Sequence, residues 1–483
     1  MSDRAGVAVP PHPSPEGKPA LTDRYSQKSG RILVSGAQAL IRMMMEQHAR
    51  DRADGLNTAG FVSGYRGSPL ADFDNELGKA RAFLDDNAIR FQPGLNEDLA
   101  ATSVWGSQQI DLSPGARHDG VFAMWYGKGP GVDRSMDAIR HANAAGTHPK
   151  GGVLLLMGDD HGAGSSTFPH QSEHVLISAM VPILAPAGVE EDIDFGLAGF
   201  AMSRFSGAWV GFKCQTEIVE CTASADLPDP AQRPVLPAFD MPPGGLSIRW
   251  PDDKLAQEAR LETKLRAVRA FAVANGLDRI LGAGQGARRG IVATGKAWRD
   301  LQGAFAAAGI DPEEGGLRLL KVGLVWPLVA ETLDSFAEGL DEILVIEEKR
   351  PVIEDQIRAH FYNRPDGIRP RLWGKTTAEL DPCGLVQVLS AFLHRDNPVA
   401  VSEALKPAPP IPFREPYFCS GCPHSVSTKL PDGSRATAGI GCSMLAVSMN
   451  RNVETFTQMG GEGANWIGHA PFTDEKHVFV HMG

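Results

Sequence analysis

Three cysteines near the end of the sequence have the spacing of a soft-metal site. Cys419 and Cys422 stand at i and i+3, His424 follows closely, and Cys442 ends the run Gly-Ile-Gly-Cys. Two such thiolates can bind one side of an iron or zinc ion while a third closes from another loop. The residues alone leave three chemistries open: an iron–sulfur cluster, a structural zinc ion with His424 as fourth ligand, or a redox dithiol.

A glycine-rich loop follows these cysteines. Residues 459–466 read Met-Gly-Gly-Glu-Gly-Ala-Asn-Trp and lead into an expected helix, and an apolar strand is expected from His477 onward. Glycines let the backbone approach a ligand closely, although most glycine-rich turns are only turns. The pattern is therefore compatible with a cofactor loop.

Three further loops follow apolar runs in the first half of the chain. Residues 64–69 read Gly-Tyr-Arg-Gly-Ser-Pro, residues 91–98 end in Asn-Glu-Asp ahead of an expected helix, and residues 158–167 combine Gly-Asp-Asp-His-Gly with Ser-Ser-Thr. If the runs are parallel strands, these loops lie at the carboxyl edge of the sheet, where α/β domains bind ligands.

One short motif points to another class of enzyme. His170-Gln-Ser-Glu173-His174 fits the HxxEH pattern of inverted zinc peptidases, in which two histidines one helical turn apart bind zinc and the glutamate activates water. Pro169 is compatible with a helix start. This zinc peptidase remains an alternative function.

Composition limits the classes of protein. The chain has 483 residues, 42% hydrophobic and 22% charged, and a formal charge of −11, which argues against a nucleic-acid partner. Two of its six cysteines form a CxxC, which favours a reducing compartment over a disulfide framework. Neither a signal peptide nor an eighteen-residue apolar run is found, so we expect a cytoplasmic protein without a membrane partner.

The expected elements give an α/β, multi-domain fold with parallel sheets covered by helices. Residues 1–30 are polar and proline-rich and predict a flexible tail. A strand at 31–34 leads into a helix at 37–48, and uninterrupted apolar runs predict parallel strands at 59–62, 120–126, 152–157, 182–186 and 208–212. These elements form a first α/β domain at 31–220.

Later segments predict two more units. A proline-rich stretch and a docking helix that starts at Pro251 and ends at Gly276 occupy 221–285. A second α/β domain at 286–400 contains strands at 289–294, 317–325 and 342–347 and a helix at 297–308. The cysteines lie in a third unit at 401–483.

Taken together, the motifs resemble one family. The 64–69 loop, Asn96-Glu97, residues 158–167, Val345-Ile-Glu-Glu-Lys-Arg-Pro351, the CSGCPH and GIGC pair, and GGEGANWIG are similar to the indolepyruvate:ferredoxin oxidoreductases. Their large fused bacterial form is the nearest likeness. The resemblance covers residues 30–483 in matching order and places the chain among the thiamine-diphosphate-dependent 2-oxoacid:ferredoxin oxidoreductases.

The resemblance implies a reaction and a set of cofactors. An aryl 2-oxoacid of the indolepyruvate type is oxidatively decarboxylated with coenzyme A to an acyl-CoA and CO2, and electrons pass through an iron–sulfur cluster to ferredoxin. The implied cofactors are thiamine diphosphate, Mg²⁺ and a [4Fe-4S] cluster. The domains at 31–220, 286–400 and 401–483 resemble the pyrimidine-binding, transketolase-C-terminal-like and diphosphate-binding domains of thiamine enzymes.

The same resemblance assigns residues to roles. Glu97 matches the glutamate that binds the aminopyrimidine ring of the cofactor, while its alternative role is a carboxylate at a helix N-terminus. Cys419, Cys422 and Cys442 match three cluster ligands. The implied cofactor-binding positions are Gly64, Tyr65, Gly67, Ser68, Pro69, His424, Gly460, Gly461 and Gly463.

Several expectations concern assembly and completeness. A homodimer is expected, because such enzymes hold the cofactor between domains. The third domain reads as truncated before its Mg²⁺ loop and fourth cluster ligand, so the chain is expected to be a fragment or subunit inactive alone. A non-catalytic remnant with a binding or assembly role is the other alternative. Phe168, Trp125 and Tyr126 are candidates for an aryl pocket, with core packing favoured for each.

Overall fold

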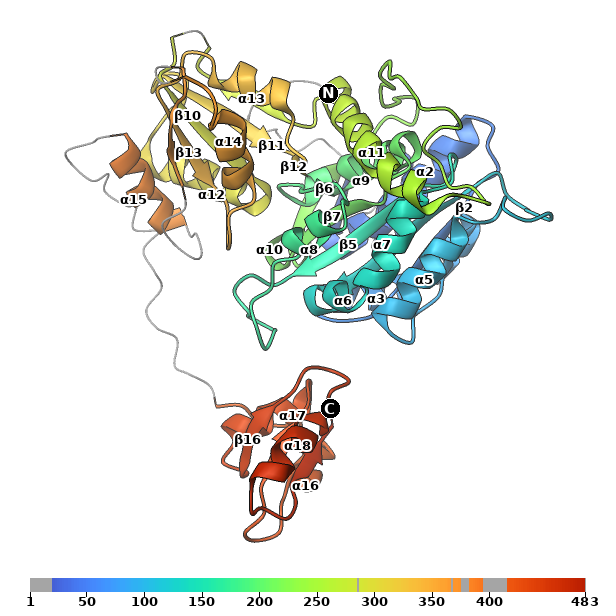
Figure 1. The fold of residues 1–483 in the computed structure, drawn as a ribbon, viewed down its shortest axis with the longest axis vertical. Coiled ribbons are helices and arrows are strands. Elements are labelled where there is room, and N and C mark those ends of the chain that lie inside the picture. The colour runs from blue at the N-terminus through green and yellow to red at the C-terminus, as the bar shows by residue number, and fades with distance from the viewer. Residues whose placement is uncertain (1–19, 285, 366–367, 375–381, 394–414, 483) are drawn as a thin grey trace. The chain divides into compact units, whose positions relative to one another are not determined.

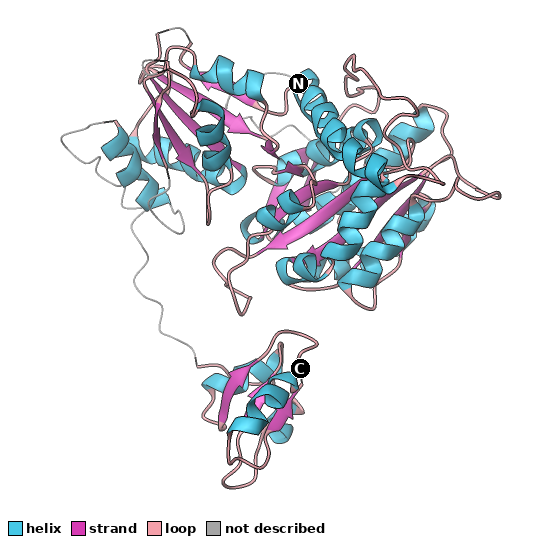
Figure 2. Ribbon diagram, in the orientation of Figure 1, coloured by secondary structure: helices cyan, strands magenta, loops and turns pink. Residues whose placement is uncertain are grey.

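The computed structural model describes residues 20–284, 286–365, 368–374, 382–393 and 415–482 (Figures 1 and 2). The chain divides into two compact units, residues 1–406 and 407–483. The expected boundary at residue 400 lies outside the described residues. Each unit is therefore treated by itself.

A seven-stranded sheet organises the first part of unit 1, in the order β12-β6-β7-β5-β4-β2-β3. Strands β2 to β7 run parallel, and β12 pairs antiparallel with β6. Their bounds are β2 Ala59–Gly64, β3 Ile89–Phe91, β4 Val121–Lys128, β5 Val153–Asp159, β6 Ile183–Leu184, β7 Val210–Gln215 and β12 Leu324–Trp326. All five apolar runs predicted as strands are confirmed, and β3 is the parallel strand that the sequence did not reveal.

Helices cover both faces of this sheet (Figure 1). Alternate residues of β4 and β5 enter different cores: Trp125 and Leu155 pack with α5 and α7, whereas Tyr126 and Leu156 pack with α2, α3, α9 and α11. Burial on both faces explains why the strands read as unbroken apolar runs. The helices around this sheet are α2 Gly36–Ala53, α3 Ala71–Lys79, α4 Arg81–Asp86, α5 Glu97–Ser107, α6 Gly129–Arg134, α7 Met136–Ala145, α8 Glu173–Ser178, α9 Val189–Ser206, α10 Thr216–Val219 and α11 Lys254–Asn275.

The N-terminal segment differs from expectation. The predicted first strand, β1 (Arg31–Ser35), pairs antiparallel with β8 (Thr222–Asp226) in a separate two-stranded sheet. Residues 20–30, placed by sequence in the tail, include helix α1 (Asp23–Ser26), and the Arg42 guanidinium donates to the carbonyls of Arg24 and Gln27. The polar composition of residues 20–30 did not predict these contacts, because their partner is a buried arginine and not an apolar core. Residues 1–19 lie outside the described residues.

A five-stranded sheet in the order β14-β13-β10-β11-β9 forms the second part of unit 1. Its strands are β9 Arg279–Gly282, β10 Arg289–Thr294, β11 Leu317–Val322, β13 Glu342–Ile346 and β14 Arg371–Trp373, and its helices are α12 Gly295–Ala308, α13 Ala330–Ala337, α14 Ile353–Phe361 and α15 Pro382–Phe392. Strands β10, β11, β13 and β14 are parallel, and β9 is antiparallel to β11.

The two sheets of unit 1 share a segment. The run predicted as one strand at 317–325 breaks at Gly323, so that β11 stays in the five-stranded sheet while β12 joins the seven-stranded one. Asp278 accepts the amides of Gly323 (2.8 Å) and Leu324 (3.0 Å) at this break, and its burial raises its pKa to about 6. One hydrophobic core contains residues of both sheets, including Leu155 of β5 and Val292 of β10.

Unit 2 contains a small parallel sheet in the order β16-β15-β17. Its elements are α16 His424–Ser427, β15 Ala436–Ala438, α17 Cys442–Leu445, β16 Val453–Phe456, α18 Ala464–His469 and β17 Phe479–His481, with short 3₁₀ turns at Ala446–Ser448 and Ala470–Phe472. The expected helix after the glycine-rich loop and the expected final strand are both present. Across the described parts of both units, every helix is too short or too polar to cross a lipid bilayer.

Candidate functional site

The carboxyl edge of the seven-stranded sheet gathers three loops. The amide of Gly94 donates to the Gly64 carbonyl at 2.9 Å, and the amide of Tyr65 donates to the Tyr126 carbonyl at 3.1 Å. Ser68 Oγ is hydrogen-bonded to Ser165 Oγ. The 64–69 loop therefore lies between the 92–96 loop, the end of β4 and the loop that follows β5.

Glu97 lies in this group as the first residue of α5. Asn96 caps the helix by accepting the Leu99 amide at 2.8 Å, and Trp125 Nε1 donates to the Glu97 carbonyl at 2.9 Å. The Glu97 residue is only 7% exposed, yet no side chain or amide in the described residues donates to its carboxylate. Its two oxygens are not among the side-chain atoms of the described residues that are shut off from solvent without a partner, so the carboxylate is open to a donor from a ligand.

The first turn of α6 (Gly129–Arg134) is packed tightly against this edge. A Cβ at Gly131 would lie 2.5 Å from Cγ and 2.8 Å from Oε1 of Glu97, and a Cβ at Gly129 would lie 2.0 Å from Nδ1 of His170. Such approaches exclude any larger residue. Glycine at both positions therefore lets the α6 backbone contact Glu97 and His170 directly.

His170 lies between two carboxylates. Its Nε2 is 2.9 Å from Asp133 Oδ2 and its Nδ1 is 3.4 Å from Asp159 Oδ1. Burial opposes the charged ring, but the hydrogen bonds to Asp133 and Asp159 outweigh it and raise the pKa of His170 to about 9. Asp159 also accepts from the amide (2.9 Å) and hydroxyl (2.6 Å) of Ser172.

These contacts contradict the zinc peptidase geometry. Helix α8 begins at Glu173, so His170 precedes the helix and is not one helical turn from His174. Glu173 is hydrogen-bonded to Lys213, and His170 is held by the two aspartates. A search of the described residues found no three His, Cys, Asp or Glu side chains arranged to hold a metal ion.

Lys128 is a site residue that the sequence analysis did not select. It ends β4, its Nζ lies 3.4 Å from the Ser165 carbonyl, and burial lowers its pKa against a smaller opposing effect of Asp160. A Cβ at Gly67 would lie 3.2 Å from its Cβ, so the 64–69 loop packs on the lysine stem. Its position at the carboxyl end of an apolar strand could have identified Lys128 as a site residue from the sequence.

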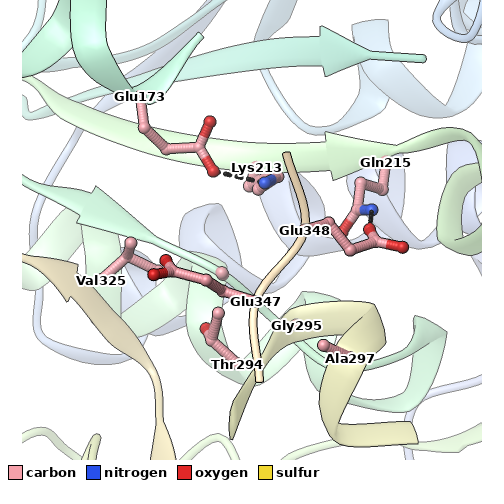
Figure 3. Close-up of a pocket in the computed structure, with 10 residues that line it drawn as sticks. Glu173, Lys213, Gln215, Thr294, Gly295, Ala297, Val325, Glu347 and Glu348 are labelled. Atoms are coloured by element: carbon pink, nitrogen blue, oxygen red, sulfur yellow. Dashed lines mark hydrogen bonds and ion pairs between the residues drawn. The ribbon is translucent and has the colours of Figure 1, made fainter. Parts of the chain in front are cut away.

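A buried ionic network joins the two sheets of unit 1 (Figure 3). Glu348 Oε2 accepts from Gln215 Nε2 (2.5 Å) and lies 2.9 Å from His161 Nδ1, while its Oε1 accepts from Lys296 Nζ (3.0 Å). Burial favours the neutral carboxyl, but His161 and Lys296 outweigh it and lower the pKa of Glu348. The network borders a cavity of about 20 Å³, enough for one water molecule.

The main contacts of the Val345–Pro351 motif are made by its two glutamates, Glu347 and Glu348. Glu347 accepts the amides of Val352, Ile353 and Glu354 at 2.9 to 3.0 Å and so caps α14. Burial raises the pKa of Glu347 against the lowering effect of these amides. One glutamate of the pair orders its own domain, and the other contacts the seven-stranded sheet.

The cysteines and their neighbours lie in unit 2. Cys419 and Cys442 are exposed, Cys422 is half-buried, and all three are free thiols. The Cys422 amide donates to the Cys419 carbonyl at 3.0 Å, and Cys422 Sγ lies 3.3 Å from Nδ1 of His424. The structure therefore forms the CxxC turn without gathering the three thiols into a metal site. Cluster ligation remains a prediction.

The glycine-rich loop in unit 2 also forms as a turn. Gly460 and Gly463 have positive φ angles of 83° and 79°, and the Gly460 amide donates to Glu462 Oε2 at 2.8 Å. The Gly461 amide donates to the Gln458 carbonyl at 3.0 Å. The assignments of these three glycines and of His424 to cofactor binding remain predictions.

Comparisons with known proteins agree with this architecture. The family model described as the indolepyruvate ferredoxin oxidoreductase middle domain matches residues 279–384. Two relatives are indolepyruvate oxidoreductase subunit IorA of Methanothermobacter thermautotrophicus, 23% identical over 84% of this chain, and that of Pyrococcus abyssi, 24% identical over 90%. The resemblance of this chain to the indolepyruvate ferredoxin oxidoreductases is therefore supported by a match over its middle part and by similarity to IorA subunits over most of its length. It spans 61% and 65% of the length of these two relatives.

A solved structure has a similar fold. The 2-oxoglutarate:ferredoxin oxidoreductase from Magnetococcus marinus, solved with 2-oxoglutarate, coenzyme A and succinyl-CoA bound, has a TM-score of 0.52 and 15% identity. The match covers 75% of this chain and 65% of that one. The expected α/β fold class is therefore confirmed.

Proposed function

We propose that the chain forms the thiamine-diphosphate-binding part of a 2-oxoacid:ferredoxin oxidoreductase acting on an aryl 2-oxoacid of the indolepyruvate type. The overall reaction joins the acyl group to coenzyme A, releases CO2 and passes an electron pair, one electron at a time, to ferredoxin. Support comes from the match of residues 279–384 to the family model, from the similarity to IorA subunits and from the geometry around Glu97.

The observation that carries the proposal is the carboxylate of Glu97, which belongs to a largely buried residue at the carboxyl edge and accepts no hydrogen bond from the described residues. Thiamine diphosphate supplies a thiazolium carbon that attacks the substrate carbonyl and accepts the electrons left by loss of CO2. Glu97 would hold the aminopyrimidine through its ring nitrogen, which fits a carboxylate that lacks a donor from the described chain. Its place at the carboxyl edge agrees with the general location of ligand sites in α/β domains.

Two other side chains at this edge have chemistry suited to the substrate. Lys128 offers a half-buried cation whose pKa is lowered by burial, and Ser68 offers a hydroxyl beside it through their shared contact with Ser165. We assign Lys128 to the 2-oxoacid carboxylate, because an anion there would pair with a cation that water screens poorly. His170 and Asp159 hold the adjoining loop in place.

The iron–sulfur cluster is proposed from the cysteine pattern and the family, with Cys419, Cys422 and Cys442 as ligands. Among the described residues, the three thiols are not gathered into one site. Mg²⁺, the contributions of coenzyme A and ferredoxin, and the homodimer are proposed on the family resemblance alone.

The test compares two neighbouring carboxylates. Glu97→Gln and Asp98→Asn alter the two acidic residues of the first turn of α5. Titration calorimetry with thiamine diphosphate and Mg²⁺ is expected to show binding weakened roughly 10- to 100-fold in Glu97→Gln, since one charge-assisted hydrogen bond is lost. Asp98→Asn should bind as the wild type does.

Two outcomes would overturn the proposal. Equal effects of the two variants would leave Glu97 as a helix N-terminal carboxylate only. A wild-type protein, purified without oxygen, that binds no thiamine diphosphate would favour the non-catalytic remnant. In the same preparation, iron content lost in Cys419→Ser but kept in Cys221→Ser, another exposed free thiol, is the result expected for the cluster.

A further inference from the structure

The loop at residues 160–171, which follows β5, is ordered without regular secondary structure. Asp160 accepts the amides of Gly164 (3.0 Å) and Ser165 (2.9 Å) and the hydroxyl of Ser166 (2.7 Å). Burial favours the neutral carboxyl, but these donors outweigh it and lower the pKa of Asp160. A single carboxylate therefore fixes the first half of the loop.

Residues of the five-stranded sheet's domain fix both ends of the 160–171 loop. Glu348 lies 2.9 Å from His161 at one end. At the other end, Gln171 donates to the Arg350 carbonyl and accepts the Arg350 amide, both at 3.0 Å. The loop is consequently held against the seven-stranded sheet from outside that sheet.

Between these ends, the loop contacts the candidate site twice. Ser165 is hydrogen-bonded to Ser68 and accepts from Lys128, and His170 is hydrogen-bonded to Asp133 of α6. Residues 166–169 span the short distance from one contact to the other. They connect a residue that contacts Lys128 with a residue that contacts α6, and residues 167–169 among them are exposed.

This span carries one large aromatic side chain, Phe168, which is 74% exposed. Core packing, the role favoured from sequence, is confirmed for Trp125 and Tyr126, each 0% exposed, and is wrong for Phe168. A phenyl ring left in water forgoes the favourable free energy of burying its apolar surface. The ring is thus available to a ligand bound at this edge.

We propose that Phe168 is a specificity-determining residue that contacts the aromatic ring of the aryl 2-oxoacid. The inference rests on the proposed function, in which Lys128 binds the carboxylate of the same molecule. An aryl 2-oxoacid presents an anion at one end and an apolar ring at the other. The edge presents a cation in Lys128 and, three residues after the Ser165 carbonyl that this lysine contacts, an exposed phenyl ring.

The experiment compares two probes that differ only by a phenyl ring. Titration calorimetry measures the binding of phenylpyruvate and of pyruvate to the full protein as purified, in wild type, Phe168→Ala and Phe168→Leu. Tyr362→Ala is the matched control, because Tyr362 is equally exposed (74%) but lies directly after α14. Circular dichroism and thermal melts check that each variant is folded.

The expected result is selective. Phe168→Ala should weaken phenylpyruvate binding about 10-fold or more and leave pyruvate binding within about two-fold, with Phe168→Leu in between, because only the ring contact is removed. Tyr362→Ala should bind both probes as the wild type does.

Other outcomes overturn the inference in distinguishable ways. If Phe168→Ala binds both probes normally, the exposed ring faces a protein surface or solvent instead of the substrate. If Phe168→Ala loses both probes equally, the residue only supports the loop. If the wild type binds neither probe, the assignment of the 2-oxoacid to this edge fails, and the proposal about Phe168 fails with it.

Discussion

The Asp133–His170–Asp159 cluster allows a quantitative prediction about charge. The histidine pKa of about 9 in the folded protein exceeds the unfolded value of about 6.5 by about 2.5, which corresponds to at most about 3.4 kcal/mol. The Asp133 side chain is 49% exposed, so solvent screening reduces this to about 1–2 kcal/mol. Because the folded pKa is the higher one, the stabilisation is complete below about pH 6.5 and is lost as pH rises through about 9.

Nuclear magnetic resonance of the histidine rings tests this directly. The sequence has 14 histidines, and the signal that disappears in His170→Gln identifies His170. Its titration midpoint is expected near pH 9 in the wild type. In Asp133→Asn the midpoint should fall but stay above that of a free histidine, because Asp159 remains in place.

A wild-type midpoint between pH 6 and 7 would refute the reasoning. It would mean that burial outweighs the two carboxylates and that the ring is neutral at physiological pH. An unchanged midpoint in Asp133→Asn would refute the assignment of the 2.9 Å contact as the main source of the shift. Denaturation of wild type and His170→Gln at pH 6.5 and 9 supplies an independent check, because their difference in stability should shrink at the higher pH.

Two substitutions test the packing around the site. Gly131→Ala should destabilise the protein by about 1–3 kcal/mol, because its Cβ would lie 2.5 Å from Glu97 Cγ. Its control is Gly106→Ala, in open space on α5, which should be neutral or slightly stabilising. Equal melting temperatures of the two variants would contradict the contact between Gly131 and Glu97. Glu348→Gln should cost about 2 kcal/mol, since it removes a buried carboxylate from its lysine and histidine partners. Exposed Glu314→Gln is its control, and coincident urea transitions for these two variants would show that the network contributes no stability.

The 160–171 loop links the proposed substrate site to the domain of the five-stranded sheet. Glu348 and Arg350 belong to the part of the chain that matches the family model, yet they contact the loop that follows β5 of the other sheet. A change at Glu348 is therefore expected to alter both stability and the position of Phe168. Through Glu348 and Arg350, the Val345–Pro351 motif holds both ends of the 160–171 loop.

The sequence determined the features that depend on local chemistry. Unbroken apolar runs located five of the parallel strands because burial on both faces removes polar residues from them. The helix expected after Asp98 is α5, which begins two residues earlier than Leu99, at Glu97, and Gly276 predicted the end of α11, since helix caps act within one helical turn. Glycines and prolines located the 64–69 loop by the same local logic.

Only the tertiary structure decided how distant segments pair. Strand β12 leaves its own sheet at Gly323 and joins the other, although the run from 317 to 325 reads as one strand. Burial of Glu97 without a donor, the two aspartates on His170 and the exposure of Phe168 each depend on neighbours far away in sequence. The apolar patterns of strands and helices depend on residues close together in the sequence. Ion pairs and side-chain exposure depend on which distant segments pack together, and no local pattern encodes that packing.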